Sequence, residues 1–297
     1  MENTTSRRKL LKQLSVGAVA MAAGPLTTFA AAETDDNMYK LKGNINHSVC
    51  RWTYSFLSLD ELCTVAKKIG IKAIDLIGPK EWSILKTHGL DSSMCNGAEI
   101  SLTEGWNDKQ YHSTLIKNYT EHINLVADAG YKNLICFSGN KKGMDDETGL
   151  KNSVEGLKQI MALAEKRGVI IQIEVFNSKV NHPDYMADNT TWTIELCKRL
   201  GSPNFKILYD IYHMQISEGD IIATIKKNHQ YFGHYHTAGV PGRHEIDETQ
   251  ELFYPAIIKA VADTGFKGYL AQEFIPTATT KEDKIKALKK AVKLCDI

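Results

Sequence analysis

Three acidic residues and one histidine stand near the ends of four successive apolar segments in the second half of the chain. They are Glu174 in VIIQIEVFN, Asp210 in FKILYDIYH, His236 in YFGHYHTAG and Glu273 in YLAQEFIP. A carboxylate buried in a strand is costly unless it is paired or bound to a metal. In a closed parallel barrel, the carboxyl ends of all strands meet at one face. The pattern therefore predicts a site for one divalent cation.

Each of these residues could also play an ordinary structural part on its own. A barrel-interior glutamate can pair with lysine or arginine, Asp210 can cap the turn that follows it, and His236 can be a hydrogen-bonded core residue. One shared site explains all four placements together, whereas the alternatives need four separate accidents. Oxygen-rich ligands with one imidazole favour Mn²⁺ or Mg²⁺, with Co²⁺ or Zn²⁺ as substitutes.

The elements that must position these residues alternate between strand and helix signals after residue 43. Expected strands cover 45–52, 72–78, 92–100, 132–139, 169–177, 205–213, 231–239 and 268–276. The clearest helices cover 58–70, 112–130, 153–168 and 254–265, and each ends on a glycine. This repetition predicts an α/β fold, a (β/α)8 TIM barrel, as a single domain over residues 44–297. A doubly wound open sheet is the alternative, but no glycine-rich phosphate loop follows the first strand.

Residues 1–32 have the features of an export signal. A basic segment with Arg7 and Arg8 precedes an apolar stretch, and the alanines at 30–32 offer a small-residue cleavage site. The segment SRRKLLK resembles a twin-arginine signal, which predicts export to the periplasm with no stable membrane insertion after cleavage. An uncleaved anchor is the alternative. Residues 33–43 are expected to form a short polar lead.

Composition narrows the range of partners. The formal net charge of +1 gives no reason to expect a nucleic-acid partner, so we expect a small-molecule substrate. The sequence is also compatible with a homo-oligomer. None of the six cysteines forms a Cys-x-x-Cys pair, and most lie in apolar segments. We expect them to be small buried residues, with a disulfide as the alternative.

Motifs at the last four strand ends resemble a known family. The segments IEVFN, DIYHMQ, GHYHTAGVPGRHE and QEF occur in this order, with FYPAI after the third. Together they resemble the xylose-isomerase-like TIM-barrel superfamily, and within it the hydroxypyruvate isomerase branch, over nearly the whole chain after Asn44. Val175 and Phe176 stand where that branch usually has Pro-Leu. His236 stands where it often has Gln, and histidine there is similar to the ketose 3-epimerases of the same superfamily.

The resemblance implies a role for each motif residue. It implies that Glu174, Asp210, His236 and Glu273 bind one divalent metal. Glu174 and Glu273 would also be the catalytic acid–base pair. His213 and Arg243 would contact substrate oxygens, and Asn177 is expected beside them.

Further candidates lack a motif. His47, near the end of the first strand, is included among the expected substrate-binding residues. Trp52 and Trp82 could line the pocket or simply pack in the core. His234 faces the same side of its strand as His236, and we leave it out of the ligand set.

These residues predict an enzyme that moves a proton beside a carbonyl. A metal stabilises the enediolate, one carboxylate removes the proton, and a second group returns it. The preferred prediction is isomerisation of hydroxypyruvate to tartronate semialdehyde, and the alternative is a ketose 3-epimerase or keto-sugar isomerase. The other classes are a non-catalytic sugar-binding barrel and an endonuclease IV-like phosphodiesterase, which usually needs more metal ligands.

Overall fold

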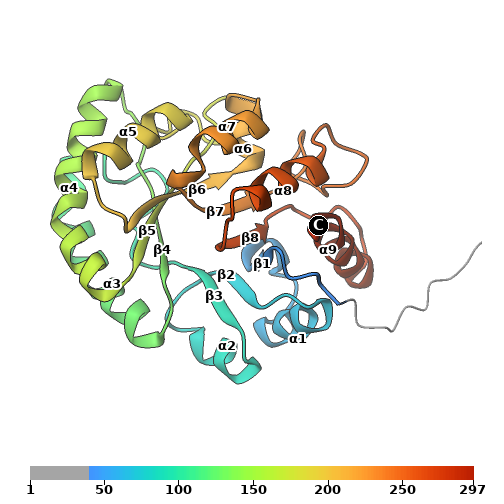
Figure 1. The fold of residues 1–297 in the computed structure, drawn as a ribbon. Helices are drawn as coiled ribbons and strands as arrows, with labels where there is room; N and C mark the ends of the chain where they lie inside the picture. The colour runs from blue at the N-terminus through green and yellow to red at the C-terminus, as the bar shows by residue number, and fades with distance from the viewer. Residues whose placement is uncertain (1–39) are drawn as a thin grey trace, which may run out of the picture. The chain divides into compact units, whose positions relative to one another are not determined.

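Eight parallel strands close into a barrel in residues 40–297, the part of the chain that the computed structural model describes (Figure 1). Each strand is hydrogen-bonded to the next in chain order, and β8 closes the circle on β1. The strands are β1 (Asn46–Cys50), β2 (Ala73–Ile77), β3 (Asp91–Cys95), β4 (Asn133–Cys136), β5 (Ile170–Glu174), β6 (Phe205–Asp210), β7 (Phe232–Thr237) and β8 (Tyr269–Gln272). The predicted (β/α)8 barrel is confirmed, and the open sheet is excluded.

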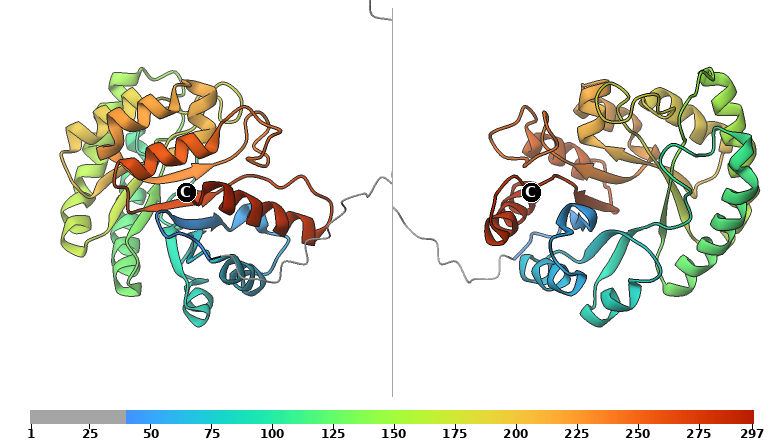
Figure 2. Two further views of the ribbon diagram at one scale, coloured as in Figure 1. Left: turned by 45° about the vertical axis from the view of Figure 1, so that its right-hand side comes forward. Right: turned by 180° about the vertical axis from the view of Figure 1, so that it is seen from behind.

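Helices follow the strands and form the outer layer, as the views in Figure 2 show. The α-helices are α1 (Leu59–Ile69), α2 (Trp82–His88), α3 (His112–Ala129), α4 (Asp146–Arg167), α5 (Thr190–Leu200), α6 (Ile211–Ser217), α7 (Ile221–Asn228), α8 (Tyr254–Asp263) and α9 (Lys281–Cys295). Short 3-10 helices are η1 (Trp52–Tyr54), η2 (Lys109–Tyr111) and η3 (His229–Tyr231). The four helices predicted most clearly correspond to α1, α3, the second part of α4, and α8.

Local capping explains why α1 begins and ends where the sequence predicts. The hydroxyl of Ser58 accepts a hydrogen bond from the N–H of Glu61 at 3.2 Å, and the Glu61 carboxylate accepts from the N–H of Ser58 at 2.7 Å. A cap of this kind stabilises a helix by about 1 kcal/mol. The helix ends at Gly70, whose φ of 95° is open to glycine and strained for other residues.

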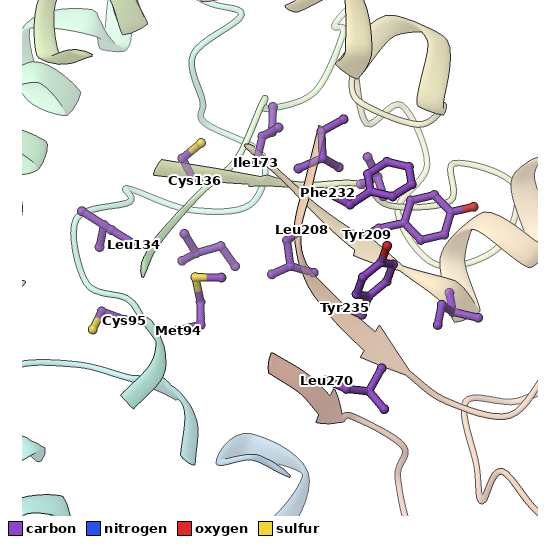
Figure 3. Close-up of a cluster of buried hydrophobic side chains, with 14 of the residues drawn as sticks. Met94, Cys95, Leu134, Cys136, Ile173, Leu208, Tyr209, Phe232, Tyr235 and Leu270 are labelled. Atoms are coloured by element: carbon purple, nitrogen blue, oxygen red, sulfur yellow. The ribbon is translucent and has the colours of Figure 1, made fainter. Parts of the chain in front are cut away.

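Alternation along the strands separates polar from apolar side chains. In β5, Gln172 and Glu174 share the inner face, where Gln172 donates to Asn133 of β4 at 2.9 Å. Ile171 and Ile173, which alternate with them along the strand, lie on the opposite face, which packs under the helices. Figure 3 shows Ile173 among other buried apolar side chains of the strands. Polar groups placed on the inner face can therefore meet across the barrel.

The predicted export signal at 1–32 and the first part of the polar lead at 33–43 lie outside the described residues. The end of the lead contacts the barrel, because the N–H of Lys42 donates to both carboxylate oxygens of Asp296 at 3.0 Å. From residue 40 onward, none of the helices combines the length and the apolar character needed to cross a membrane. All six cysteines lie in this part of the chain and are buried as free thiols.

His47 lies on the wrong face of β1 for a substrate contact. Cys50, three residues later, faces the barrel interior, with its sulfur 3.6 Å from Oδ1 of Asp75. Strand alternation puts His47 on the opposite face, where its Nε2 lies 4.0 Å from Oδ1 of Asp296, next to α9. The prediction that His47 lines the substrate pocket is therefore wrong.

The buried His47 should make the fold sensitive to acid. Burial lowers its pKa from 6.5 to about 4. As the pH falls, the unfolded chain therefore binds a proton at His47 before the folded chain does. The contribution of neutral His47 to the free energy of unfolding is complete above pH 6.5 and is lost as the pH falls toward 4. The depression corresponds to about 3 kcal/mol.

His47→Leu should therefore flatten the fall in the free energy of unfolding across that pH range, measured by urea denaturation at each pH. The control is His229→Leu, in the exposed part of η3, which should keep the wild-type slope. Equal slopes for wild type and His47→Leu would contradict this expectation.

Candidate metal centre and active site

The structure brings the four predicted metal ligands together at one end of the barrel. One potential ligand atom from each of Glu174, Asp210, His236 and Glu273 lies within 4.8 Å of the other three, and all four side chains are buried. Nδ1 of His236 lies 3.0 Å from Oε1 of Glu174 and 2.9 Å from Oε2 of Glu273. The carboxylates and the imidazole therefore converge on one small region, called the metal cluster below.

Strand direction explains this convergence. Glu174 and Asp210 are the last residues of β5 and β6, His236 is the residue before the end of β7, and Glu273 directly follows β8. All strands run in parallel, so these positions share the carboxyl-terminal mouth of the barrel. Asp210 and His236 are also paired in register between β6 and β7.

Asp210 uses its two oxygens differently. Its Oδ1 accepts a hydrogen bond from the N–H of His213 at 3.0 Å and so caps α6. Its Oδ2 is buried without a hydrogen-bond partner and lies 3.5 Å from Nη2 of Arg243. Capping was the structural alternative for this residue, and the geometry shows that capping still leaves one oxygen facing the cluster.

Asp75 in β2 is the site residue that the sequence reasoning missed. Its Oδ1 lies 3.0 Å from Nε2 of His236, while the other ring nitrogen faces Glu174 and Glu273. An imidazole that donates from Nε2 to a carboxylate keeps Nδ1 unprotonated and available to a cation. A signal was present in KAIDLIG, where an aspartate interrupts an apolar strand just as the four predicted ligands do.

The strand β2 is irregular around Asp75 on the side that pairs with β3, while its pairing with β1 stays in register. The register between β2 and β3 shifts on both sides of Asp75, and the next residue, Leu76, has a positive φ of 59°. Such bulges redirect side chains and often lie beside active sites. Oδ2 of Asp75 accepts from the Ser93 hydroxyl at 2.5 Å and lies 2.9 Å from Nε2 of His234. His234 is thus a supporting residue under the cluster.

Burial and like charge work against full ionisation of the cluster. Burial raises the pKa of Asp210 to about 8 and also raises the pKa of Glu174. Burial opposes ionisation of Glu273 as well, but Arg243 and His236 hold its pKa well below the usual range. Burial opposes protonation of His236, yet Glu273 and its neighbours raise its pKa. An added cation would favour the ionised form of every carboxylate.

These observations fit a divalent cation. Oδ2 of Asp210 is an unpartnered buried oxygen, and Nδ1 of His236 faces the carboxylates. The donor set of three carboxylates and one imidazole suits a hard or borderline ion.

A cavity of about 510 Å³ opens at this end of the barrel, and Glu174, Glu273 and Arg243 are part of its wall. A second cavity of about 510 Å³ lies at the other end, lined by residues such as Asn46 and Tyr269, which begin β1 and β8. Active sites of this fold occupy the carboxyl-terminal mouth. We therefore assign the chemistry to the first cavity, called the active-site cavity below.

Arg243 and Trp52 hold one side of the cluster. Nη2 of Arg243 lies 2.5 Å from Oε2 of Glu273, and Nε1 of Trp52 donates to Oε1 of the same residue at 2.8 Å. The Arg243 guanidinium also lies 5.2 Å from the centre of the Trp52 ring. Trp52 therefore belongs to the site. Trp82 belongs to the core, where its buried N–H donates to the carbonyl of Ile77.

His213 and Asn177 lie next to the cluster but are not among the residues that line the active-site cavity. The side-chain amide of Asn177 donates to Nδ1 of His213 at 2.6 Å, so Nε2 carries the proton and lies 3.6 Å from Oδ2 of Asp210. Burial, with the charge of Arg243, lowers the pKa of His213 well below its usual value. Asn177 also accepts from the N–H of Val180, which fixes the turn after β5. A substrate contact by either residue stays a prediction.

Comparison with known proteins supports the resemblance. A sequence model of the xylose isomerase-like TIM barrel family matches residues 63–291. A 2-oxo-tetronate isomerase from Cupriavidus necator is 35% identical over 127 residues, which are 43% of this chain and 48% of that protein. Hydroxypyruvate isomerase from Escherichia coli K12 is 26% identical over 252 residues, which are 81% of this chain and 96% of that protein. The chain spans about half the length of most of the curated relatives it matches.

The fold is shared with solved structures. The crystal structure of 3-keto-D-glucoside 4-epimerase from E. coli matches with a TM-score of 0.69 and 16% identity, covering 84% of this chain and 99% of that one. At this level of identity, the likeness shows the fold alone.

Asp75→Asn should weaken cation binding at the metal cluster. An amide can donate to Nε2 of His236 and so favour the proton on Nδ1, the nitrogen that faces the cluster. We expect the Kd for Mn²⁺, measured by the electron paramagnetic resonance signal of free Mn²⁺, to rise about 10–100-fold. Asp91→Asn, the same change at the first residue of β3, should leave the Kd unchanged. Unaltered Mn²⁺ affinity in a folded Asp75→Asn protein would remove this role for Asp75.

Proposed function

Since the chain belongs to the xylose isomerase-like TIM barrel family, we propose that it is a metal-dependent isomerase or epimerase of a hydroxyketone. The observation that carries the proposal is the placement of Glu174 and Glu273 against the same nitrogen of His236, beside the active-site cavity. The relatives named 2-oxo-tetronate isomerase and hydroxypyruvate isomerase support the same class of reaction.

The proposed reaction removes a proton from the carbon beside a carbonyl and then returns it. A divalent cation, Mn²⁺ or Mg²⁺, held by Glu174, Asp210, His236 and Glu273 would supply Lewis-acid stabilisation of the enediolate charge. Glu174 and Glu273 come from different strands and would act on opposite faces of the substrate as base and acid. Returning the proton to the former carbonyl carbon, while the proton of the neighbouring hydroxyl passes to the former carbonyl oxygen, gives isomerisation. Returning the proton to the opposite face of the carbon it left gives epimerisation.

Neighbouring side chains fix the orientation of the Glu273 carboxylate for proton transfer. The indole N–H of Trp52 binds one carboxylate oxygen, and Arg243 contacts the other. Both oxygens therefore have a fixed direction before substrate arrives, which is the preorganisation that proton transfer requires. Arg243 also lines the active-site cavity, where its planar donors could reach substrate oxygens.

The competing functions fit the site less well. A phosphodiesterase of the endonuclease IV type usually binds two or three metals. In residues 40–297, every close group of three or more metal-ligating side chains includes His236, so these groups describe one centre. A non-catalytic sugar-binding barrel would need no acid–base residue on each side of its ligand.

We also propose that the protein is exported, on the support of the twin-arginine-type segment that contains Arg7 and Arg8. Replacing both residues with lysine should hold the protein in the cytoplasm, because the export signal depends on the arginine pair. Immunoblots of periplasmic and cytoplasmic fractions would measure this. Equal periplasmic levels with and without the arginine pair would refute a twin-arginine route.

The catalytic proposal predicts metal-dependent proton exchange. The purified protein loaded with Mn²⁺ in D₂O should introduce deuterium beside the carbonyl of hydroxypyruvate or a ketose, followed by NMR. Glu174→Gln and Asp210→Asn should each lower the bound metal below one ion per chain and slow exchange by about 10²–10⁴-fold. Glu195→Gln, a surface change on α5, is the control and should match wild type. Full metal content and full exchange in both site variants would remove the site hypothesis.

A further inference from the structure

The charged side chains on the wall of the active-site cavity are mostly acidic. Glu99, Glu174 and Glu273 contribute three carboxylates, and among the described residues of this wall Arg243 is the one arginine or lysine. A carboxylate or phosphate on a substrate needs a cationic partner that is not already engaged. The wall therefore offers an anion more repulsion than attraction.

Arg243 is already engaged by the protein. Its Nη2 lies 2.5 Å from Oε2 of Glu273 and 3.5 Å from Oδ2 of Asp210. Its guanidinium is also held against two rings, 5.2 Å from the centre of Trp52 and 5.5 Å from that of Tyr212. An incoming anion would have to compete with buried carboxylates for this group.

The centre has no cationic charge left over for an anionic substrate. The three carboxylates of the metal cluster are matched by Arg243 and a divalent cation, and the Asp75 carboxylate beside His236 is a further buried acid. Glu99 adds a further negative charge to the wall, where it accepts a hydrogen bond from the N–H of Gly97 at 2.8 Å. Burial lowers the pKa of His182, the histidine on the wall, and so disfavours its cationic form. A neutral substrate matches this balance.

The rest of the wall is largely apolar. It includes Leu76, Ile100, Ile135, Phe137 and Phe176, and the two phenylalanine rings stack with their centres 5.8 Å apart. Pockets of about 300–1,000 Å³ hold ligands of drug size, so the cavity of about 510 Å³ has room for far more than a three-carbon acid. Apolar and aromatic walls suit the C–H face of a sugar ring, as well as apolar groups attached to it.

Two large apolar side chains on this wall remain exposed to solvent. Trp52 is 42% exposed and Leu102 is 38% exposed, and both line the active-site cavity. Exposed apolar side chains on a cavity wall offer a ligand apolar surface to cover. They lie where a substrate that extends beyond its reacting carbons would be covered.

We propose that the active-site cavity accepts a neutral keto-sugar of hexose size or larger, and that it excludes keto-acids and sugar phosphates. This inference rests on the proposed function, because the reacting ketone is placed by that chemistry. It goes further in assigning the charge and size of the substrate from the wall of the cavity.

Pairs of compounds that differ mainly in charge test the inference by exchange. With the full chain loaded with Mn²⁺ in D₂O, dihydroxyacetone is compared with hydroxypyruvate, and each D-ketohexose with its 6-phosphate. We expect kcat/KM for deuterium uptake to be about tenfold or more higher for the neutral member of each pair. We also expect a ketohexose to exceed dihydroxyacetone. Faster exchange on hydroxypyruvate or on the phosphates would overturn the inference while leaving the proposed function intact.

A binding measurement decides the inference separately from catalysis. Isothermal titration compares phenyl β-D-glucopyranoside with phenyl β-D-glucuronide, which differ by one carboxylate. The neutral glycoside should bind about tenfold or more tightly than the glucuronide. This result would support the substrate class even if no compound exchanged deuterium, an outcome that would count against the proposed function alone. Tighter glucuronide binding, or no binding of either compound, would overturn the inference.

A positive charge introduced on the wall should reduce the preference for the neutral glucoside over the glucuronide. Leu102→Lys adds a cation to the wall of the active-site cavity, so the preference for the glucoside over the glucuronide should narrow by about tenfold. Leu125→Lys, a leucine of similar exposure on α3 (37%), is the matched control and should leave the preference unchanged. An unaltered preference in a folded Leu102→Lys protein would show that wall charge does not select the substrate.

Discussion

Three carboxylates buried around one imidazole are the constraint on which the rest of this structure depends. Removing carboxylates from water costs several kcal/mol each unless opposite charge or hydrogen bonds offset the loss. The chain meets this cost with Arg243 beside Glu273, with the helix cap on Asp210, and with His236 between two glutamates. These compensations still leave Oδ2 of Asp210, one of the atoms proposed to hold the cation, buried without a hydrogen-bond partner.

His236 joins two layers of this arrangement. One ring nitrogen faces the carboxylates of the mouth, and the other faces Asp75 in the barrel interior. Asp75 faces the interior at the point where the register between β2 and β3 shifts. The next residue, Leu76, lines the active-site cavity. Two successive residues of β2 thus serve the site, Asp75 by orienting His236 and Leu76 as part of the cavity wall.

The strand ends and the loops that follow them supply different parts of the site. Strand ends supply the metal cluster: Glu174, Asp210 and His236 lie at the ends of β5, β6 and β7, and Glu273 directly follows β8. Segments after the strands supply the wall: Glu99 and Leu102 follow β3, and Arg243 follows β7. Walls of this kind can change without disturbing the cluster, so the same proton-transfer chemistry can serve acids in one protein and neutral sugars in another.

The sequence by itself determined the barrel and the four cluster residues, because both depend on local signals. Strand and helix periods are short-range, and a charged residue such as Glu174 inside an apolar run stands out without knowledge of its partners. The tertiary structure decided which face each side chain occupies and what it meets. His47 was misplaced because its side chain lies on the outer face of β1, next to α9. Asp75 gave the same local signal as Glu174, but its part in orienting His236, 161 residues away, is visible only in the folded barrel. The charge of the cavity wall is likewise a sum over distant segments, and only the closed barrel brings those segments together.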